Sequence, residues 1–250
     1  IQAEGETTVV EPLMSRDHTE RLLDIFGVPI KRTRGQVTVQ RASLHAPERI
    51  EVPGDISSAA YWLVAATLIP GSDLLLKNVG INPTRTGILD VMKAMGADIT
   101  LLAEHISGNE PVADIRIKAA PLRGVSFGAS LIPRLIDEIP VIVAAALLAE
   151  GETIITGAGE LRVKETDRLQ AMAEEYNKLA PGSLTERSDG LVIHGQSALR
   201  FAAVSSRADH RIAMALAVAG AAGDGVEIRD PDCVDISYPN FYQTLEVLRK

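Results

Sequence analysis

Cysteine is nearly absent from this 250-residue sequence, which contains Cys233 alone. One cysteine cannot form a disulfide within the chain, and it cannot build a cysteine-based metal site. The histidines show no HxH or HxxxH spacing, so the residues offer no metal-ligating pattern. A chain without disulfides suits a reducing compartment, and we expect it to be cytoplasmic.

Aromatic residues and positive charge are also in short supply. Aromatics make up 4% of the residues, against 46% for all hydrophobic residues, so the core must consist mainly of small and branched side chains. The net charge of −8 disfavours a nucleic-acid partner held by general electrostatics. An anionic small substrate fits such a chain only where local basic groups overcome the overall charge.

Long apolar runs and glycine-rich phosphate loops are missing too. The longest apolar runs have the length of a buried helix and are rich in alanine and glycine, which argues against a membrane span. The chain has no signal-like start. It contains no glycine pattern of the P-loop or dinucleotide-binding type, which disfavours nucleotide cofactors.

Three segments share one pattern, in which an acidic residue precedes an alanine-rich helix, a glycine turn and a short strand. They cover residues 54–80, 135–160 and 208–232. The acidic residues are Asp55, Asp137 and Asp209, and aspartate at such a place can cap the free N–H groups of the first helical turn. The helices are apolar nearly all round, which is typical of buried helices. The pattern therefore predicts an α/β fold with three buried helices inside and strands outside.

Amphipathic helices followed by strand pairs complete the first two of these units. They are predicted over residues 84–98 and 165–182, and both end near glycine, as helices commonly do. Residues 1–52 show the same second half, with a helix over 15–28 and two strands, but no front half.

We therefore place a domain boundary at residues 53–55. Residues 1–52 are interpreted as the tail of an N-terminal lobe, and residues 53–250 as a C-terminal lobe of three repeats that closes with a helix after Pro239. Because the chain opens with Ile1 in a strand-like stretch, we interpret it as a fragment or a processed chain.

The segment ELRVKETDR, residues 160–168, contains six charged residues in nine positions. We expect a helix to begin near Glu165, with Lys164 and Arg168 four residues apart on similar faces. A helix N-terminus favours anions, so this segment is a candidate phosphate or carboxylate site, although a solvated surface face is the simpler interpretation. Similar basic helix starts occur at Ser15-Arg16 and at His210-Arg211.

Two carboxylates lie among these cations. Asp137 opens an apolar helix, and from the residues alone a simple N-cap is the favoured interpretation. Glu165 can form an ordinary ion pair with its neighbour Lys164. If Asp137 and Glu165 faced one cleft, they could act as a general acid and base. The segment 82–87 is interpreted as a loop with a helix cap, and Cys233 as a small buried residue.

Six motifs occur along the chain in the order SRDHTERLL, PGDISSAA, NPTRTGI, LIDEIP, ELRVKETDR and DHR. In these motifs the whole chain resembles the 5-enolpyruvylshikimate-3-phosphate synthase family, in its bacterial class II variants. The resemblance implies an inside-out α/β barrel of two domains, each with three βαβαββ units, of which one is largely present here beside the tail of the other. It also implies a transferase of the shikimate pathway, which leads to the aromatic amino acids.

The implied reaction moves the enolpyruvyl group of phosphoenolpyruvate to the 5-hydroxyl of shikimate 3-phosphate and releases phosphate. It proceeds through a tetrahedral intermediate without a metal or an organic cofactor. Asp137 would bind the shikimate hydroxyls and take a proton, Lys164 would touch both substrates, and Glu165 would move protons at the methylene carbon. The remaining implied contacts are Ser15 and Arg16 with shikimate 3-phosphate, and Arg168, His210 and Arg211 with phosphoenolpyruvate.

The sequence departs from the family pattern at two positions and in one segment. Ile236 stands where many relatives have lysine, and Glu160 where some have asparagine. The family's N-terminal segment, with further basic residues for phosphoenolpyruvate and a Ser-Ser-Gln phosphate grip, does not occur in residues 1–250. We therefore expect little turnover from this chain alone, and activity only with that segment as a second chain or as another part of the same one.

Two other functions compete with this interpretation. Within the superfamily, the acceptor could be UDP-N-acetylglucosamine, but the RVKETDR and DHR motifs favour shikimate 3-phosphate. The chain could also be a non-catalytic half-barrel that binds anions and serves only in assembly. The presence of Asp137, Lys164, Glu165 and Arg211 argues against such a remnant.

Overall fold

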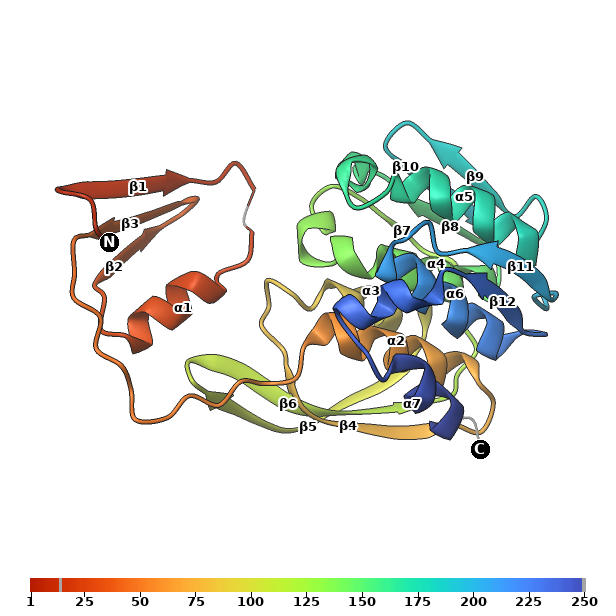
Figure 1. Ribbon diagram of the computed structural model, residues 1–250, viewed down its shortest axis with the longest axis horizontal. Helices are drawn as coiled ribbons and strands as arrows, with labels where there is room; N and C mark the ends of the chain where they lie inside the picture. The colour runs from red at the N-terminus through yellow and green to blue at the C-terminus, as the bar shows by residue number, and fades with distance from the viewer. Residues whose placement is uncertain (14, 249–250) are drawn as a thin grey trace.

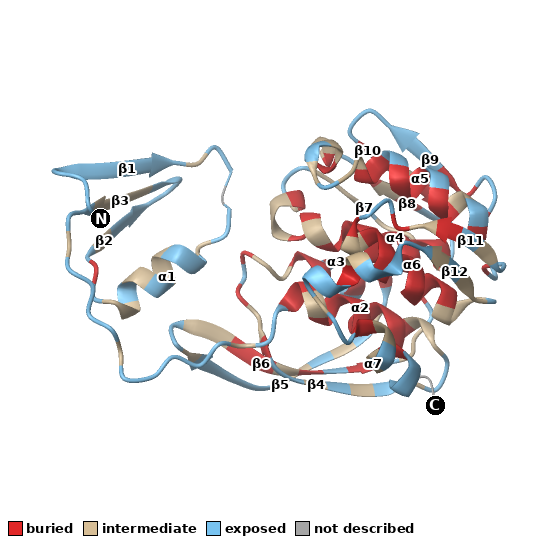
Figure 2. Cartoon of the chain, in the orientation of Figure 1, coloured by how far each residue is buried: buried red, intermediate tan, exposed pale blue. Residues whose placement is uncertain are grey.

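The computed structural model describes residues 1–13 and 15–248, which form a small N-terminal part and a larger body (Figure 1). The N-terminal part contains β1 (Glu6–Val10), α1 (His18–Ile25), β2 (Ile30–Thr33) and β3 (Gln36–Gln40). The strands form an antiparallel sheet in the order β1-β3-β2. Among the described residues before position 53, only Val28 is buried, as the pale colours of Figure 2 show. This part therefore encloses no core of its own.

The larger body consists of helices and strands in alternation. Its first stretch contains α2 (Ile56–Leu68), β4 (Asp73–Gly80), α3 (Gly87–Met95), β5 (Asp98–Ser107) and β6 (Glu110–Lys118). Its second contains β7 (Ser126–Phe127), α4 (Ile139–Leu147), β8 (Glu152–Ile155), α5 (Arg168–Leu179), β9 (Leu184–Arg187) and β10 (Gly190–His194). Its third contains β11 (Ala202–Ser205), α6 (His210–Ala222), β12 (Val226–Arg229) and α7 (Phe241–Leu248).

The strands of the larger body form three separate sheets on the outside of the molecule. Their orders are β4-β6-β5, β7-β8-β10-β9 and β11-β12. The first sheet is antiparallel, whereas β7 runs parallel to β8 and β11 runs parallel to β12. Each sheet lies against the helical interior (Figure 1).

Three helices, α2, α4 and α6, form that interior and contact one another. All nine residues of α4 are buried, and α2 and α6 are buried along most of their length (Figure 2). Because alanine adds little bulk, alanine-rich helices can pack closely on every side. The arrangement with helices inside and strands outside is the one that the sequence predicts.

Two expectations about this body need correction. Cys233 is partly exposed instead of buried. The helix that was expected to begin near Glu165 begins at Arg168, with Asp167 as the residue that caps it. In the described part of the chain, no helix is both long enough and apolar enough to cross a lipid bilayer.

Candidate active site

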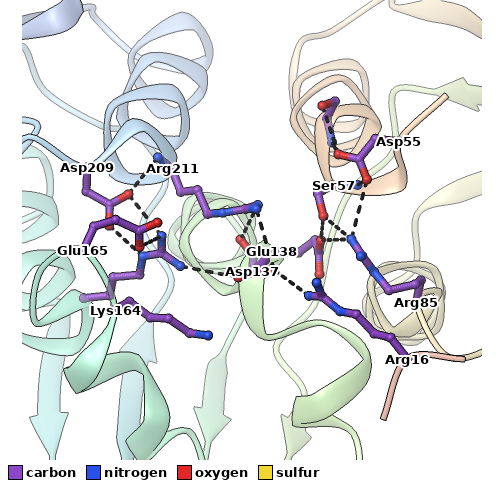
Figure 3. A network of polar contacts seen from close by, with 12 residues as sticks. Arg16, Asp55, Ser57, Arg85, Asp137, Glu138, Lys164, Glu165, Asp209 and Arg211 are labelled. Atoms are coloured by element: carbon purple, nitrogen blue, oxygen red, sulfur yellow. Dashed lines mark hydrogen bonds and ion pairs between the residues drawn. The ribbon is translucent and has the colours of Figure 1, made fainter. Parts of the chain in front are cut away.

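Asp137 lies at the centre of a cluster of guanidinium groups (Figure 3). It belongs to a short 3₁₀ helix, Ile136–Glu138, that leads into α4. Nη2 of Arg16 donates to its Oδ2 at 2.5 Å, and Nη2 of Arg211 lies 3.6 Å from the same oxygen. Nη1 of Arg168 lies 3.6 Å from Oδ1. Three arginines from distant parts of the chain therefore surround one carboxylate.

This arrangement corrects the interpretation of Asp137 as an N-cap. Capping requires the side-chain oxygen to accept an N–H group of the first helical turn. Asp55 does this for α2, and Asp209 does it for α6, where it accepts the N–H groups of Arg211 and Ile212 at 2.8 and 3.3 Å. The oxygens of Asp137 are directed toward arginines instead, so its carboxylate belongs to the site and not to the helix end.

The surrounding charges decide the protonation state of Asp137. Its burial alone would raise the pKa of the carboxyl group, because burial disfavours the charged form. The positive charge of Arg211, the hydrogen bond and charge of Arg16, and the charge of Lys164 outweigh burial and lower the pKa to about 2. Asp137 is therefore ionised at neutral pH.

We predict that Asp137 stabilises the fold in a pH-dependent way. Because its pKa falls from 3.8 to about 2 on folding, the contribution is fully present above the pKa of the unfolded chain and is lost as the pH falls through about 2. After allowance for solvent screening at this partly exposed pair, we expect about 1 kcal/mol at pH 6. Urea unfolding of the wild type and Asp137→Asn at pH 6, 4 and 3 measures the difference between their free energies of unfolding. We expect this difference to become smaller as the pH falls. A difference that stays constant would contradict a lowered pKa of Asp137.

Arg168 connects Asp137 to two further carboxylates. Its side chain is 1% exposed, and its Nε donates to Oδ2 of the fully buried Asp209 at 2.7 Å. Its Nη2 donates to Oε2 of Glu165 at 2.6 Å. A guanidinium group carries donors in a planar fork, which allows one arginine to face three carboxylates. Arg168 thus contacts the carboxylates of both Asp137 and Glu165.

The charged segment 160–168 is arranged differently from the prediction. Lys164 precedes α5, so it does not share a helix face with Arg168. Its Nζ binds Oε1 of Glu160 at 2.9 Å, whereas Glu165 binds Arg168. The ordinary Lys164–Glu165 ion pair that the sequence allowed is therefore absent from the described part of the chain, and each residue has another partner. Glu160, one of the departures from the family pattern, is the residue that holds Lys164.

A second cluster lies beside Asp137 and was missed by the sequence analysis. Glu138 is buried, and the hydroxyl of Ser57 donates to its Oε1 through a short hydrogen bond. Arg85 donates to that hydroxyl at 2.5 Å and approaches Asp55 and Glu138 at 3.6 and 3.8 Å. Burial raises the pKa of Glu138, although the bond from Ser57 and the charge of Arg85 act against this.

The sequence contained a signal for this second cluster. Glu138 follows Asp137 in the LIDEIP motif, and Arg85 lies in NPTRTGI, a motif that was interpreted as a loop with a helix cap. Thr86, at the start of α3, makes no capping bond with its side chain. In this motif, Arg85 therefore contributes to the second cluster, whereas the expected side-chain cap of α3 is not formed by Thr86.

The remaining candidate residues lie at or beyond the edge of the site. His210 is the first residue of α6, and burial together with the charge of Arg211 lowers its pKa. Ser15 is exposed, and its hydroxyl donates to Oε1 of Glu11 at 2.5 Å. Ile236 is 84% exposed. The structure therefore brings together Arg16, Asp137, Lys164, Glu165, Arg168 and Arg211, with His210 adjacent.

Contacts between the two parts of the chain bring Arg16 to Asp137. Nδ1 of His18 lies 2.7 Å from Oε1 of Glu110, and Nδ2 of Asn82 donates to Oδ1 of Asp17 at 2.7 Å. A cavity of about 430 Å³ lies at this junction, next to the second cluster. Asp55, Arg85 and Glu110 line this cavity, whereas the Asp137 cluster lies outside its lining. Among the described residues, no group of three or more acidic, histidine or cysteine side chains is arranged to hold a metal ion.

Comparisons with known proteins agree on one family. The family model described as EPSP synthase (3-phosphoshikimate 1-carboxyvinyltransferase) matches residues 1–245. The curated 3-phosphoshikimate 1-carboxyvinyltransferase of Synechocystis sp. is 53% identical over 98% of this chain and 55% of its own length. The protein of the same name from Gloeobacter violaceus is 51% identical over 100% of this chain and 58% of its own length. The chain thus spans somewhat more than half the length of these relatives.

Solved structures give the same picture. The EPSP synthase from Acinetobacter baumannii is 41% identical, with a TM-score of 0.91 over 98% of this chain and 57% of that protein. The enolpyruvyl transferase NikO from Streptomyces tendae has a TM-score of 0.78 at 21% identity, which supports the shared fold alone. The predicted fold class, an α/β barrel with its helices inside, is confirmed by this likeness and by the arrangement of the helices.

Proposed function

The chain belongs to the EPSP synthase family, and from this premise we propose that it transfers the enolpyruvyl group of phosphoenolpyruvate to the 5-hydroxyl of shikimate 3-phosphate, releasing phosphate. One observation carries the proposal. Asp137 is ionised among three arginines, and one of these arginines also holds Glu165. Anionic substrates require such cations, and an addition followed by an elimination requires carboxylates that can exchange protons.

The arginines would exchange partners when the substrates bind. Arg16, Arg168 and Arg211 pair with the carboxylate of Asp137. Substrate phosphate and carboxylate groups would share these cations and so reduce the positive charge that Asp137 experiences. The pKa of Asp137 would then rise from about 2 toward its ordinary value, which makes the carboxylate a stronger base at the moment when the 5-hydroxyl needs to lose its proton.

Each chemical step has a group within reach of the site. In the addition, the 5-oxygen of shikimate 3-phosphate bonds to the central carbon of phosphoenolpyruvate and gives its proton to Asp137, while the methylene carbon gains a proton. In the elimination, the methyl carbon loses a proton, the bond to the phosphate oxygen breaks, and the departing phosphate takes up the proton that Asp137 accepted. We assign the proton exchange at that carbon to Glu165, whose side chain is half-exposed, with Lys164 beside it to contact both substrates.

We also propose how the chain is organised and what it needs. Residues 1–52 would be the tail of an N-terminal lobe, and residues 53–250 a C-terminal lobe of three βαβαββ-type repeats. The exposed surfaces of β1–β3 and α1 support this division, because they have almost no buried residues. Turnover would require the segment of the relatives that this chain does not span. The reaction would take place in the cytoplasm. Ser15 would contact shikimate 3-phosphate, and His210 would contact phosphoenolpyruvate.

Phosphate release tests this function directly. The chain would be assembled with the N-terminal part of the Synechocystis relative and supplied with both substrates; we expect release that depends on shikimate 3-phosphate. Replacing shikimate 3-phosphate by UDP-N-acetylglucosamine should abolish release. No release from the folded assembly would contradict the proposal and support a non-catalytic half-barrel. Full activity from the isolated chain would contradict the need for the additional segment.

A further inference from the structure

A turn with left-handed backbone leads into α6. Arg207 and Ala208 have φ angles of 54° and 57°. Residues with a side chain rarely adopt this conformation, and two in succession store strain that the surrounding contacts must hold. The turn directly precedes Asp209, which caps α6 and binds Arg168. Its geometry therefore decides where the carboxylate of Asp209 lies.

Glu175, on the buried face of α5, holds this turn from one side. Its side chain is fully buried. Oε1 accepts bonds from Nε and Nη2 of Arg207 at 3.0 and 2.8 Å. Oε2 accepts the backbone N–H of Ser205 at 2.8 Å and Nζ of Lys178 at 2.5 Å. Burial alone would raise the pKa of Glu175, but these hydrogen bonds lower it, so the carboxylate stays charged.

Ser206, also fully buried, holds the turn from the other side. Its hydroxyl donates to the carbonyl oxygen of Asp230 at 2.9 Å and accepts the N–H of Ala208 at 3.1 Å. Its carbonyl oxygen accepts the N–H of Asp209 at 3.0 Å. The turn is therefore held by hydrogen bonds of Ser206 on one side and by the ionised carboxylate of Glu175 on the other.

Helix α5 contacts the segment 205–209 at two points. Arg168, at the start of the helix, donates to Asp209, and Glu175, two turns later, accepts from Arg207. The two pairs have opposite polarity, since α5 supplies the cation in one and the anion in the other. Loss of the Glu175 pair leaves the turn held only by the backbone and hydroxyl bonds of Ser206 and by the Arg168–Asp209 pair, so the charged support on the α5 side is weakened.

We propose that Glu175 is a positioning residue, which holds the left-handed turn at Arg207 and Ala208 and thereby places the Asp209 carboxylate that orients Arg168. Asp209 also caps the helix that carries Arg211, so two of the cations around Asp137 depend on this placement. The placement is a property of the fold. Its consequence for substrate binding rests on the proposed function.

Hydrogen exchange tests the placement without any need for activity. In Glu175→Gln, the N–H groups of Arg211 and Ile212, which donate to Asp209, should exchange about tenfold faster, while amides in the middle of α4 keep their rates. Glu174→Gln is the matched control, because Glu174 is an exposed partner of the same Arg207 and its loss leaves the Glu175 pair intact. If amide exchange in Glu175→Gln were accelerated equally in α4, or not accelerated at the start of α6, the proposal would be overturned.

Kinetics in the assembled protein separate positioning from a merely structural role. Glu175→Gln should raise the KM for phosphoenolpyruvate about tenfold, with a smaller change in kcat, since the cations move while the carboxylates that exchange protons remain. If the amides of Arg211 and Ile212 exchange faster in Glu175→Gln but the KM for phosphoenolpyruvate does not change, the proposal is overturned. Should Glu175→Gln not fold, Arg207→Gln removes the same pair from the exposed side, and the same outcomes apply. If the assembled wild type releases no phosphate, the proposed function is refuted. Amide hydrogen exchange would then be the only test of whether Glu175 positions Asp209.

Discussion

Replacing Asp137 by asparagine should lower kcat/KM for phosphate release by about 10²- to 10⁴-fold in the assembled enzyme, the range that a positioned acid or base contributes. Asparagine keeps the shape of the side chain, but it cannot take the proton of the attacking hydroxyl. It also leaves three arginines without their shared counter-ion. Initial rates with each substrate varied in turn would measure the effect.

Asp90→Asn is the matched control for this experiment. Asp90 also binds an arginine, with Arg134 Nη1 at 2.8 Å from its carboxylate, but its side chain is about half-exposed and it lies outside the site. We expect its kcat/KM to stay within about twofold of the wild type, because exposed ion pairs contribute little. A loss below tenfold in Asp137→Asn would mean that Asp137 does not accept the proton.

Replacing Arg168 by methionine should lower the free energy of unfolding by about 3–5 kcal/mol, as expected when one partner of a buried ion pair is removed. Methionine fills similar space, so the expected loss arises from charge and not from a cavity. Asp209 is fully buried, and its Oδ2 would lose the bond to Nε of Arg168. Urea unfolding at neutral pH would measure the change.

A double variant identifies the cause of this loss. Asparagine also caps helices, so Asp209→Asn removes the buried charge while keeping a cap on α6. Arg168→Met with Asp209→Asn should therefore be more stable than Arg168→Met alone. Arg116→Met is the control: Arg116 binds Asp73 with two bonds, at 2.8 and 2.6 Å, but at the surface, so its loss should destabilise the fold far less than the loss of Arg168. Equal losses at both arginines would contradict the importance of burial.

The inner helices were predictable because their information is local. The segments that form α2 and α6 are apolar nearly all round, and an aspartate precedes each helix where the first free N–H groups need an acceptor. Burial on every side is the consequence of that composition.

The partners of each charged residue were predictable only in part. The residues alone left Asp137 as a helix cap and Glu165 as a partner of Lys164, and both interpretations were wrong. Position in the chain favours neighbours as partners, but a buried guanidinium group binds whichever carboxylates the packing brings to it. Arg168 therefore joins Glu165, three residues away, to Asp209, which lies 41 residues further along the chain.

The sequence by itself determined the alternating helices and strands and their inside-out arrangement, because the apolar composition of the inner helices is local. The assignment of Asp137, Lys164, Glu165, Arg168 and Arg211 to one site came from motifs that resemble the EPSP synthase family. Only the tertiary structure decided which oxygen faces which cation, that Glu138 and Arg85 form a second cluster, and that Glu175 grips the turn before Asp209. The physical reason is that ion pairing depends on distance and desolvation. Both are set only when helices from distant parts of the chain pack together.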